Sequence, residues 1–233
     1  MTEPILDARA VRKIYRTGAE ELVALRDVDF SVNVGEWVSV MGPSGSGKTT
    51  MLNCLSGLDE IDGGTVQLGG QDLHAMSDSA RTTHRASSMG FIFQAYNLIP
   101  VFSAVENVEL PLLLAGVDTK TARARATETL DRVGLGTRLK HRPAELSGGE
   151  QQRVTVARAL AGQPSVVWAD EPTGALDSET AEIVMSLLAE LNREGLTLIV
   201  VTHDEEIGRS AQRLVNMRDG RIVSDVSLAM DAS

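Results

Sequence analysis

Residues 42–49 read Gly-Pro-Ser-Gly-Ser-Gly-Lys-Thr, and this segment constrains the fold more than any other part of the chain. It has the form GxxxxGK[ST], the phosphate-binding loop also called Walker A. The apolar run 37–41 precedes it, and apolar residues at helical spacing follow it, namely Met51, Leu52, Leu55 and Leu58. A strand that runs through such a loop into a helix directs backbone N–H groups at an anion on the helix N-terminus. The alternative is a glycine-rich turn without a ligand, which this context disfavours.

Size and composition set the broad class. The chain has 233 residues, of which 42% are hydrophobic, enough for one large α/β domain or a domain with an inserted subdomain. No apolar run approaches the roughly 20 residues of a membrane helix. The acidic start, without a secretory apolar region, predicts no export. The single cysteine, Cys54, cannot form an internal disulfide and is expected to be a small core residue.

The formal net charge is −10. Binding to nucleic-acid phosphates requires a basic patch, and the basic residues between 123 and 142 are mixed with acids, as on a solvated face. We therefore expect no nucleic-acid partner. Because an anionic lipid leaflet repels an acidic chain, work at a membrane would require a protein partner to hold this chain there.

Periodicity predicts the main elements. Val28, Phe30, Val32 and Val34 alternate with polar residues, as in a half-exposed antiparallel strand. Buried parallel strands are predicted at 38–41, 166–169 and 196–201, further strands at 63–68 and 88–93, and a hairpin at 213–224 around Asp219-Gly220. Helices are predicted from Ser103 to Pro111, which should end or kink the helix, from Thr119 to Val133, after Ser147, and along the stripe Ile183, Val184, Leu187, Leu188 and Leu191.

The apolar strand 166–169 leads into two acids, Asp170 and Glu171. A carboxylate at such a strand end can hold Mg²⁺, as in the Walker B motif. A second carboxylate can accept a proton from an attacking water. The alternative, a pair of solvated acids, is weak beside an intact phosphate-binding loop.

Residues 146–150 read Leu-Ser-Gly-Gly-Glu. Ser147 and Glu150 form a capping-box pattern. Two glycines, Gly148 and Gly149, would then open the helix at a cost of roughly 1 kcal/mol each. Because glycine lets a phosphate approach backbone N–H groups closely, we interpret this segment as a second phosphate-binding helix start.

Leu-Ser-Gly-Gly-Glu resembles the signature motif of the ATP-binding cassette family. Four further residues match family motifs in order: Tyr15 the adenine-stacking aromatic, Gln94 the Q-loop, Asp177 the D-loop and His203 the switch histidine. Each has an ordinary alternative: a core aromatic for Tyr15, surface or capping residues for Gln94 and Asp177, and a structural histidine for His203.

The segments 97–100, 106–111 and 170–178 resemble the subgroup of macrolide-export, lipoprotein-release and cell-division ATPases. Glu150, where the family more often has Gln, and Thr49, in place of the commoner Ser, are small departures.

The resemblance implies an α/β fold. It comprises a P-loop NTPase core of the RecA-like type at about 1–94 and 161–233, an antiparallel β subdomain, and an inserted helical subdomain at about 95–160. It also implies ATP and Mg²⁺ as ligands. The expected catalytic residues are Lys48, Glu171 and His203, and the expected metal ligands are Thr49, Gln94 and Asp170. The remaining nucleotide-binding residues would be Tyr15, Gly42, Ser44, Gly45, Ser46, Gly47, Thr50, Ser147, Gly148, Gly149, Glu150 and Asp177.

The family assembles its sites between two copies, so that Ser147 and Gly149 of one copy would face the phosphate loop of the other. A separate permease would dock near 94–102, at the cytoplasmic face of the membrane, and the unassembled chain would be cytoplasmic. The expected function is an ATPase subunit that drives this permease by ATP-dependent dimer closure. The alternatives are an ATP-driven regulator that signals through a membrane protein, and a soluble ABC ATPase without a transport role.

Overall fold

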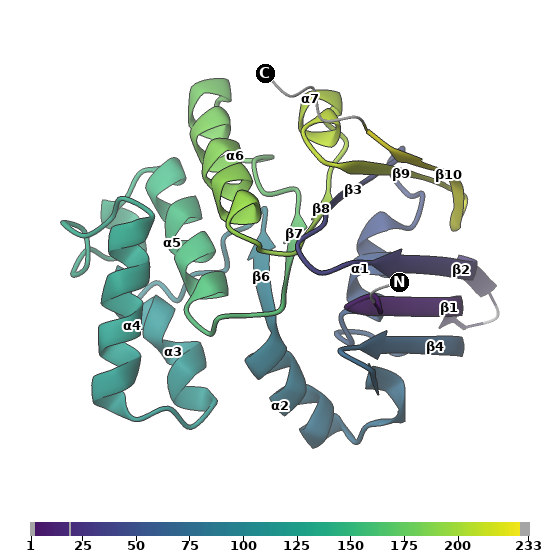
Figure 1. Ribbon diagram of the computed structural model, residues 1–233, viewed down its shortest axis with the longest axis horizontal. Coiled ribbons are helices and arrows are strands. Elements are labelled where there is room, and N and C mark those ends of the chain that lie inside the picture. Colours follow the sequence, from purple (N-terminus) through teal and green to yellow (C-terminus); the bar gives the residue numbers. More distant parts are fainter. Residues whose placement is uncertain (1–2, 19, 229–233) are drawn as a thin grey trace. The chain divides into compact units, whose positions relative to one another are not determined.

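The computed structural model describes residues 3–18 and 20–228, which form two compact units (Figure 1). The first unit comprises Met1–Thr82 and Gly195–Ser233, and the second comprises Thr83–Glu194. The first of the two boundaries between the units, between Thr82 and Thr83, lies within helix α2 (Asp78–Ser88). The subdomain boundaries predicted from the sequence stay a prediction.

The first unit is rich in strands. Its elements are β1 (Leu6–Thr17), β2 (Glu20–Val32), β3 (Trp37–Met41), α1 (Lys48–Leu55), β4 (Gly63–Leu68), β5 (Gln71–Asp72), the 3₁₀ turn η1 (Leu73–Ala75), β8 (Leu198–Val201), α7 (Glu205–Arg209), β9 (Arg213–Arg218) and β10 (Arg221–Ser227). An antiparallel sheet has the order β2-β1-β4-β5. A second set of strands has the order β10-β9-β3-β8, in which β3 runs parallel to both β8 and β9.

The apolar runs explain the second set of strands. Every residue of β3 and of β8 is buried, as expected for parallel strands covered on both faces. The predicted hairpin is confirmed, since β10 pairs antiparallel with β9 through Asp219-Gly220, where both residues have positive φ. The parallel strands β3, β8 and β9 have their carboxyl ends on the side of the glycine-rich loop 42–47, which follows β3 directly.

The predicted alternation in β2 is confirmed for Val28, Phe30 and Val32, which are buried. It is wrong for Val34, which is 72% exposed because β2 ends at Val32 and a turn follows. Strand β1, its hydrogen-bonded neighbour, was not predicted. Its buried side chains alternate imperfectly because its register against β2 shifts between Ala8 and Ile14.

The second unit is mostly helical. Its elements after α2 are β6 (Met89–Phe93), α3 (Ala104–Leu114), α4 (Thr119–Arg132), the 3₁₀ turn η2 (Pro143–Glu145), α5 (Gly148–Leu160), β7 (Val166–Asp170) and α6 (Ser178–Arg193). Strands β6 and β7 are parallel. Helices α3, α4 and α5 pack against one another, and α5 lies on β6 (Figure 1). Gly90 of β6 permits that approach, because a Cβ there would overlap the carbonyl group of Ala159.

Two helix predictions need correction. Of the two predicted effects of Pro111, an end or a kink of the helix, the end is wrong: α3 continues to Leu114, and the Pro111 carbonyl accepts a bond from the N–H of Ala115 at 3.0 Å. In α6, Val184, Leu188 and Leu191 are buried, whereas Ile183 is 51% exposed because it lies at the edge of the apolar stripe. The predicted end of α4 at Gly134 is confirmed by its left-handed φ of 75°.

Cys54 is fully buried in α1, as predicted. Over residues 3–18 and 20–228, no helix combines the length and the apolar character that crossing a membrane requires.

Candidate nucleotide-binding site

The loop 42–47 has a backbone that only glycine accommodates at two positions. Gly42 has φ 149° and Gly47 has φ 102°. A Cβ at Gly42 would overlap the carbonyl oxygen of Met217, and a Cβ at Gly47 would lie 2.8 Å from the carbonyl oxygen of Ala24. The β9–β10 turn supports the loop from outside, since the N–H of Gly220 donates to the Ser46 carbonyl at 3.0 Å. The loop is therefore wrapped tightly in the way that phosphate binding requires.

Lys48 begins α1, and its side chain folds back over this loop. Its Nζ donates to the carbonyl oxygens of Gly42 at 2.7 Å and of Pro43 at 3.1 Å. The first turn of α1 contains no acidic residue and has no side-chain cap, so its N–H groups keep their attraction for an anion. The hydroxyl of Ser46 is buried and has no hydrogen-bond partner within the described chain. These features fit a phosphate group.

Tyr15 and His203 also belong to the first unit. Tyr15 is 37% exposed, which excludes the alternative of a core aromatic. Its hydroxyl donates to Asp59 Oδ2 at 2.8 Å, so the ring lies beside the loop that follows α1. His203 is exposed on the segment between β8 and α7.

In the second unit, Gln94 and the two acids lie at the same end of a strand pair. Because β6 and β7 are parallel and in register from Met89↔Val166 to Phe93↔Asp170, Gln94 and Glu171 follow adjacent strand ends. The Gln94 amide Nε2 donates to the Gly174 carbonyl at 3.3 Å. Glu171 has a left-handed backbone with φ 48°, which is uncommon for a residue other than glycine and is typical of functional positions.

Ser147 caps α5 as predicted. Its Oγ accepts from the Glu150 N–H at 3.2 Å, and the Glu150 carboxylate accepts from the Ser147 N–H at 2.8 Å. Glu150 also accepts from Arg138 Nε at 2.8 Å. The hydrogen bond from the Ser147 backbone, followed by the one from Arg138, lowers the pKa of Glu150, so this carboxylate stays ionised. Glu150 thus both caps the helix and anchors the 138–147 segment.

The two glycines of this helix start also have packing reasons. A Cβ at Gly149 would overlap Cγ2 of Thr180 in α6, and one at Gly148 would lie 3.0 Å from the Tyr96 hydroxyl. Close approach of neighbouring side chains therefore requires Gly149 independently of a ligand, a reason that the sequence did not reveal. Asp177 is the N-cap of α6, since its carboxylate accepts from the Thr180 N–H at 2.9 Å and from the Thr180 hydroxyl at 2.9 Å.

The predicted site residues thus fall into two groups. The first unit contains Tyr15, the loop residues Gly42, Ser44, Gly45, Ser46, Gly47, Lys48, Thr49 and Thr50, and His203. The second unit contains Gln94, Ser147, Gly148, Gly149, Glu150, Asp170, Glu171 and Asp177. The Thr49 hydroxyl and the Asp170 carboxylate are oxygen ligands of the kind that Mg²⁺ prefers.

Sequence reasoning missed Asp59, Lys13 and Arg158. Asp59 and Lys13 surround Tyr15, and Arg158 bonds the segment after Gln94. None of them lies in one of the motifs described above, and their contacts join residues 44 to 62 positions apart.

Known proteins are similar to this chain over nearly its whole length. A sequence profile described as ABC transporter matches residues 25–174. An ABC transporter ATP-binding protein of Methanocaldococcus jannaschii is 45% identical over 96% of this chain and 100% of its own length. The lipoprotein-releasing system ATP-binding protein LolD 2 of Caulobacter vibrioides is 45% identical over 95% of this chain and 98% of its own.

The macrolide export ATP-binding/permease protein MacB of Bradyrhizobium diazoefficiens is 46% identical over 97% of this chain, which corresponds to 34% of that larger protein. Among solved structures, a dimeric ATP-binding cassette in a post-hydrolysis state, bound to ADP and Pi, superposes with a TM-score of 0.88 at 42% identity and covers 97% of this chain and 99% of its own. The fold is that of a P-loop NTPase. The chain belongs to the ABC transporter family, as an ATP-binding cassette of the MacB and LolD type.

Proposed function

We propose that this chain is the ATP-hydrolysing subunit of an ABC transporter and that two copies close around ATP to drive a separate permease. The observation that carries the proposal is the wrapped glycine loop with Lys48 folded over it, in a chain that also contains the acidic pair at the end of β7 and the capped start of α5. The match to a dimeric cassette bound to ADP and Pi supports both the nucleotide and the assembly.

The chemistry follows from positioning and charge. Lys48 and the N–H groups of residues 45–49 would bind the β- and γ-phosphates, and Tyr15 would stack on the adenine. Thr49 and Asp170 would hold Mg²⁺, with Gln94 beside it; the ion, when bound, neutralises charge on the phosphates. Glu171 would accept the proton of the attacking water, and His203 would contact the γ-phosphate.

The second copy would complete each site. Ser147, Gly148 and Gly149 present a helix N-terminus, which favours the γ-phosphate bound to the partner's loop, and Asp177 would lie at the seam. ATP binding would stabilise the closed dimer, and hydrolysis would release it. The driving force is the difference in nucleotide affinity between the closed and open arrangements, a few kcal/mol.

The permease would contact the segment after Gln94. Its apolar side chains are only partly buried, and Val101 is 69% exposed. Phe91 and Phe93 stack at 5.9 Å beside it. Partly exposed apolar side chains gathered in one segment favour a protein contact there. The docked cassette would then lie at the cytoplasmic face of the membrane.

The proposal is tested with the Glu171→Gln variant in saturating Mg·ATP. We expect it to bind ATP, to hydrolyse it at least about a hundredfold more slowly, and to sediment and scatter light as a dimer, because removal of the base prevents the hydrolysis that opens the dimer.

Two further variants test the other roles. Lys48→Ala should lose ATP binding. Ser147→Arg in the Glu171→Gln background should bind ATP and stay monomeric. A Glu171→Gln chain that takes up ATP but stays monomeric contradicts dimer closure, and wild-type turnover contradicts the role of Glu171.

A further inference from the structure

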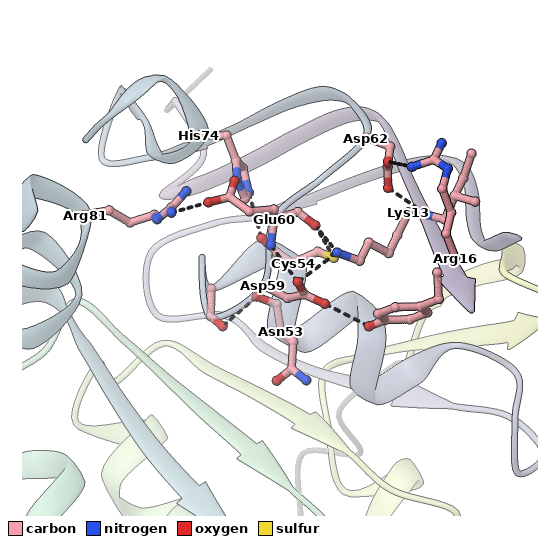
Figure 2. A network of polar contacts seen from close by, with 12 residues as sticks. Lys13, Arg16, Asn53, Cys54, Asp59, Glu60, Asp62, His74 and Arg81 are labelled. Atoms are coloured by element: carbon pink, nitrogen blue, oxygen red, sulfur yellow. Dashed lines mark hydrogen bonds and ion pairs between the residues drawn. The ribbon is translucent and has the colours of Figure 1, made fainter. Parts of the chain in front are cut away.

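A polar network joins β1 to the loop that follows α1 (Figure 2). Lys13 and Tyr15 lie on β1, and Asp59 lies on the loop. Asp59 is bonded through both of its carboxylate oxygens. Oδ2 accepts from the Tyr15 hydroxyl at 2.8 Å, and Oδ1 accepts from Lys13 Nζ at 2.7 Å.

Lys13 is itself held firmly. It is buried, and its Nζ also donates to the Glu60 carbonyl oxygen at 2.7 Å. A buried ammonium requires such partners, because an unpaired one would cost several kcal/mol. Figure 2 shows Lys13 directed at Asp59 and at the loop backbone. Movement of Asp59 away from Tyr15 would therefore disturb its ion pair with the buried Lys13.

The loop is fixed to the helix of the phosphate loop. The N–H groups of Leu58 and Asp59 donate to the Asn53 carbonyl at 2.8 and 3.0 Å. Asn53 lies on α1, which begins at Lys48. A continuous path of hydrogen bonds thus runs from the helix that follows the glycine loop, through Asp59, to the Tyr15 ring.

The protonation states suit this arrangement. Burial, followed by the hydrogen bond to Asp59, raises the pKa of Tyr15, so its hydroxyl stays protonated and donates. Burial alone would raise the pKa of Asp59, but the hydrogen bonds from Lys13 and Tyr15 outweigh it and lower the pKa. The contact is a charge-assisted hydrogen bond, which is stronger and more directional than one between neutral groups.

Lys13 also decides which side of the ring a base can use. Its Nζ lies 5.0 Å from the centre of the Tyr15 ring, so a cation covers one face. A nucleobase would therefore stack on the opposite face.

From these contacts we infer that Asp59, held by Lys13, is the positioning residue for the nucleotide base: it sets the orientation of the Tyr15 ring and its spacing from the phosphate loop. This inference rests on the proposed binding of ATP at that loop. Asp59 is expected to affect the binding of the base and not the binding of the triphosphate. A preset ring loses less conformational freedom when the base binds.

The test compares Mg·ATP with magnesium tripolyphosphate, which has no base, by titration calorimetry. Asp59→Ala and Tyr15→Phe should each weaken ATP binding about tenfold and change tripolyphosphate binding less than about twofold. In the Tyr15→Phe background, Asp59→Ala should add little, because both changes remove the same contact. Glu60→Gln is the matched control: it breaks the ion pair of the neighbouring loop residue with Arg81, away from Tyr15, and should leave both affinities unchanged.

Three results would overturn the inference. One is normal ATP affinity in Asp59→Ala and in Tyr15→Phe, together with weak ATP binding by Tyr15→Leu. The Tyr15 ring would then contact the base, but its hydrogen bond to Asp59 would not contribute to binding. Another is an equal loss of ATP and tripolyphosphate affinity, which would mean general damage to α1. The third is additive effects in the double variant. Failure of the proposed function looks different, since Lys48→Ala would then keep the affinities of the wild-type chain.

Discussion

Arg158 in α5 donates Nη2 to the carbonyl oxygen of Tyr96 at 2.8 Å, and its Nη1 donates to the neighbouring Asn97 carbonyl at 2.6 Å. Tyr96 and Asn97 both have left-handed backbones, with φ 50° and 52°. Such conformations cost free energy in residues other than glycine and persist only when their surroundings hold them. The guanidinium fork thus holds the segment after Gln94 in place from the same helix that Ser147 caps.

Arg158→Lys should destabilise the protein, because a single ammonium group cannot reproduce the planar fork that serves two carbonyls. We expect a loss of about 1–3 kcal/mol in the free energy of unfolding, measured by urea denaturation. Arg153→Lys is the control, since Arg153 on the same helix serves one carbonyl, that of Val133, at 3.3 Å. Equal losses of unfolding free energy in the two variants would show that the contact of one guanidinium with two carbonyls is not the cause of the destabilisation.

Gly149→Ala should also destabilise the protein, through packing. The new methyl group would overlap Cγ2 of Thr180, and overpacking of this kind costs about 1–3 kcal/mol. Adding Thr180→Ser should recover most of the loss, because serine keeps the hydroxyl bonded to Asp177 and removes the methyl group. Thermal unfolding of the two variants decides the point, and a double variant no more stable than Gly149→Ala alone would contradict it.

Gly174→Ser should lower ATP hydrolysis several-fold while changing stability by less than about 0.5 kcal/mol. A Cβ at Gly174 would lie 2.9 Å from Nε2 of Gln94, so the amide must move away and lose its bond to the Gly174 carbonyl. Because the amide is the flexible end of an exposed side chain, the fold can tolerate the move. Steady-state phosphate release measures the effect. The control variant Ala175→Ser, one residue further along the chain, should hydrolyse ATP at the normal rate. Equal rates of hydrolysis in the two variants would mean that the position of the Gln94 amide does not affect the reaction.

Cys54 should resist alkylation in the folded protein. Burial raises the pKa of its thiol from 9.0 to about 12, so the reactive thiolate is scarce at about pH 8.5. Since the folded pKa is the higher one, the stability that this thiol contributes is fully present below pH 9.0 and is lost as the pH rises toward about 12. Mass spectrometry after iodoacetamide treatment should show modification only in urea. Rapid labelling under native conditions would contradict the buried environment.

The sequence by itself determined the local features of this protein. The glycine-rich loop, the capping pair Ser147 and Glu150, the buried strands and the Asp219-Gly220 hairpin all follow from backbone preferences and from periodicity over a few residues. The order of the motifs also indicated the family, which the comparisons confirm. These predictions succeeded because each depends on residues close together in the chain.

Only the tertiary structure decided what depends on distant contacts. The tether from Asp59 to Tyr15 spans 44 positions, and the bond from Arg158 to Tyr96 spans 62. The packing reason for Gly149 lies in Thr180, on another helix. The exposure of Val34 likewise depends on where β2 ends, and that of Ile183 on which side of α6 is covered. A sequence pattern records which residues can pair or pack, but the partner is chosen only when the chain has folded and brought the two segments together.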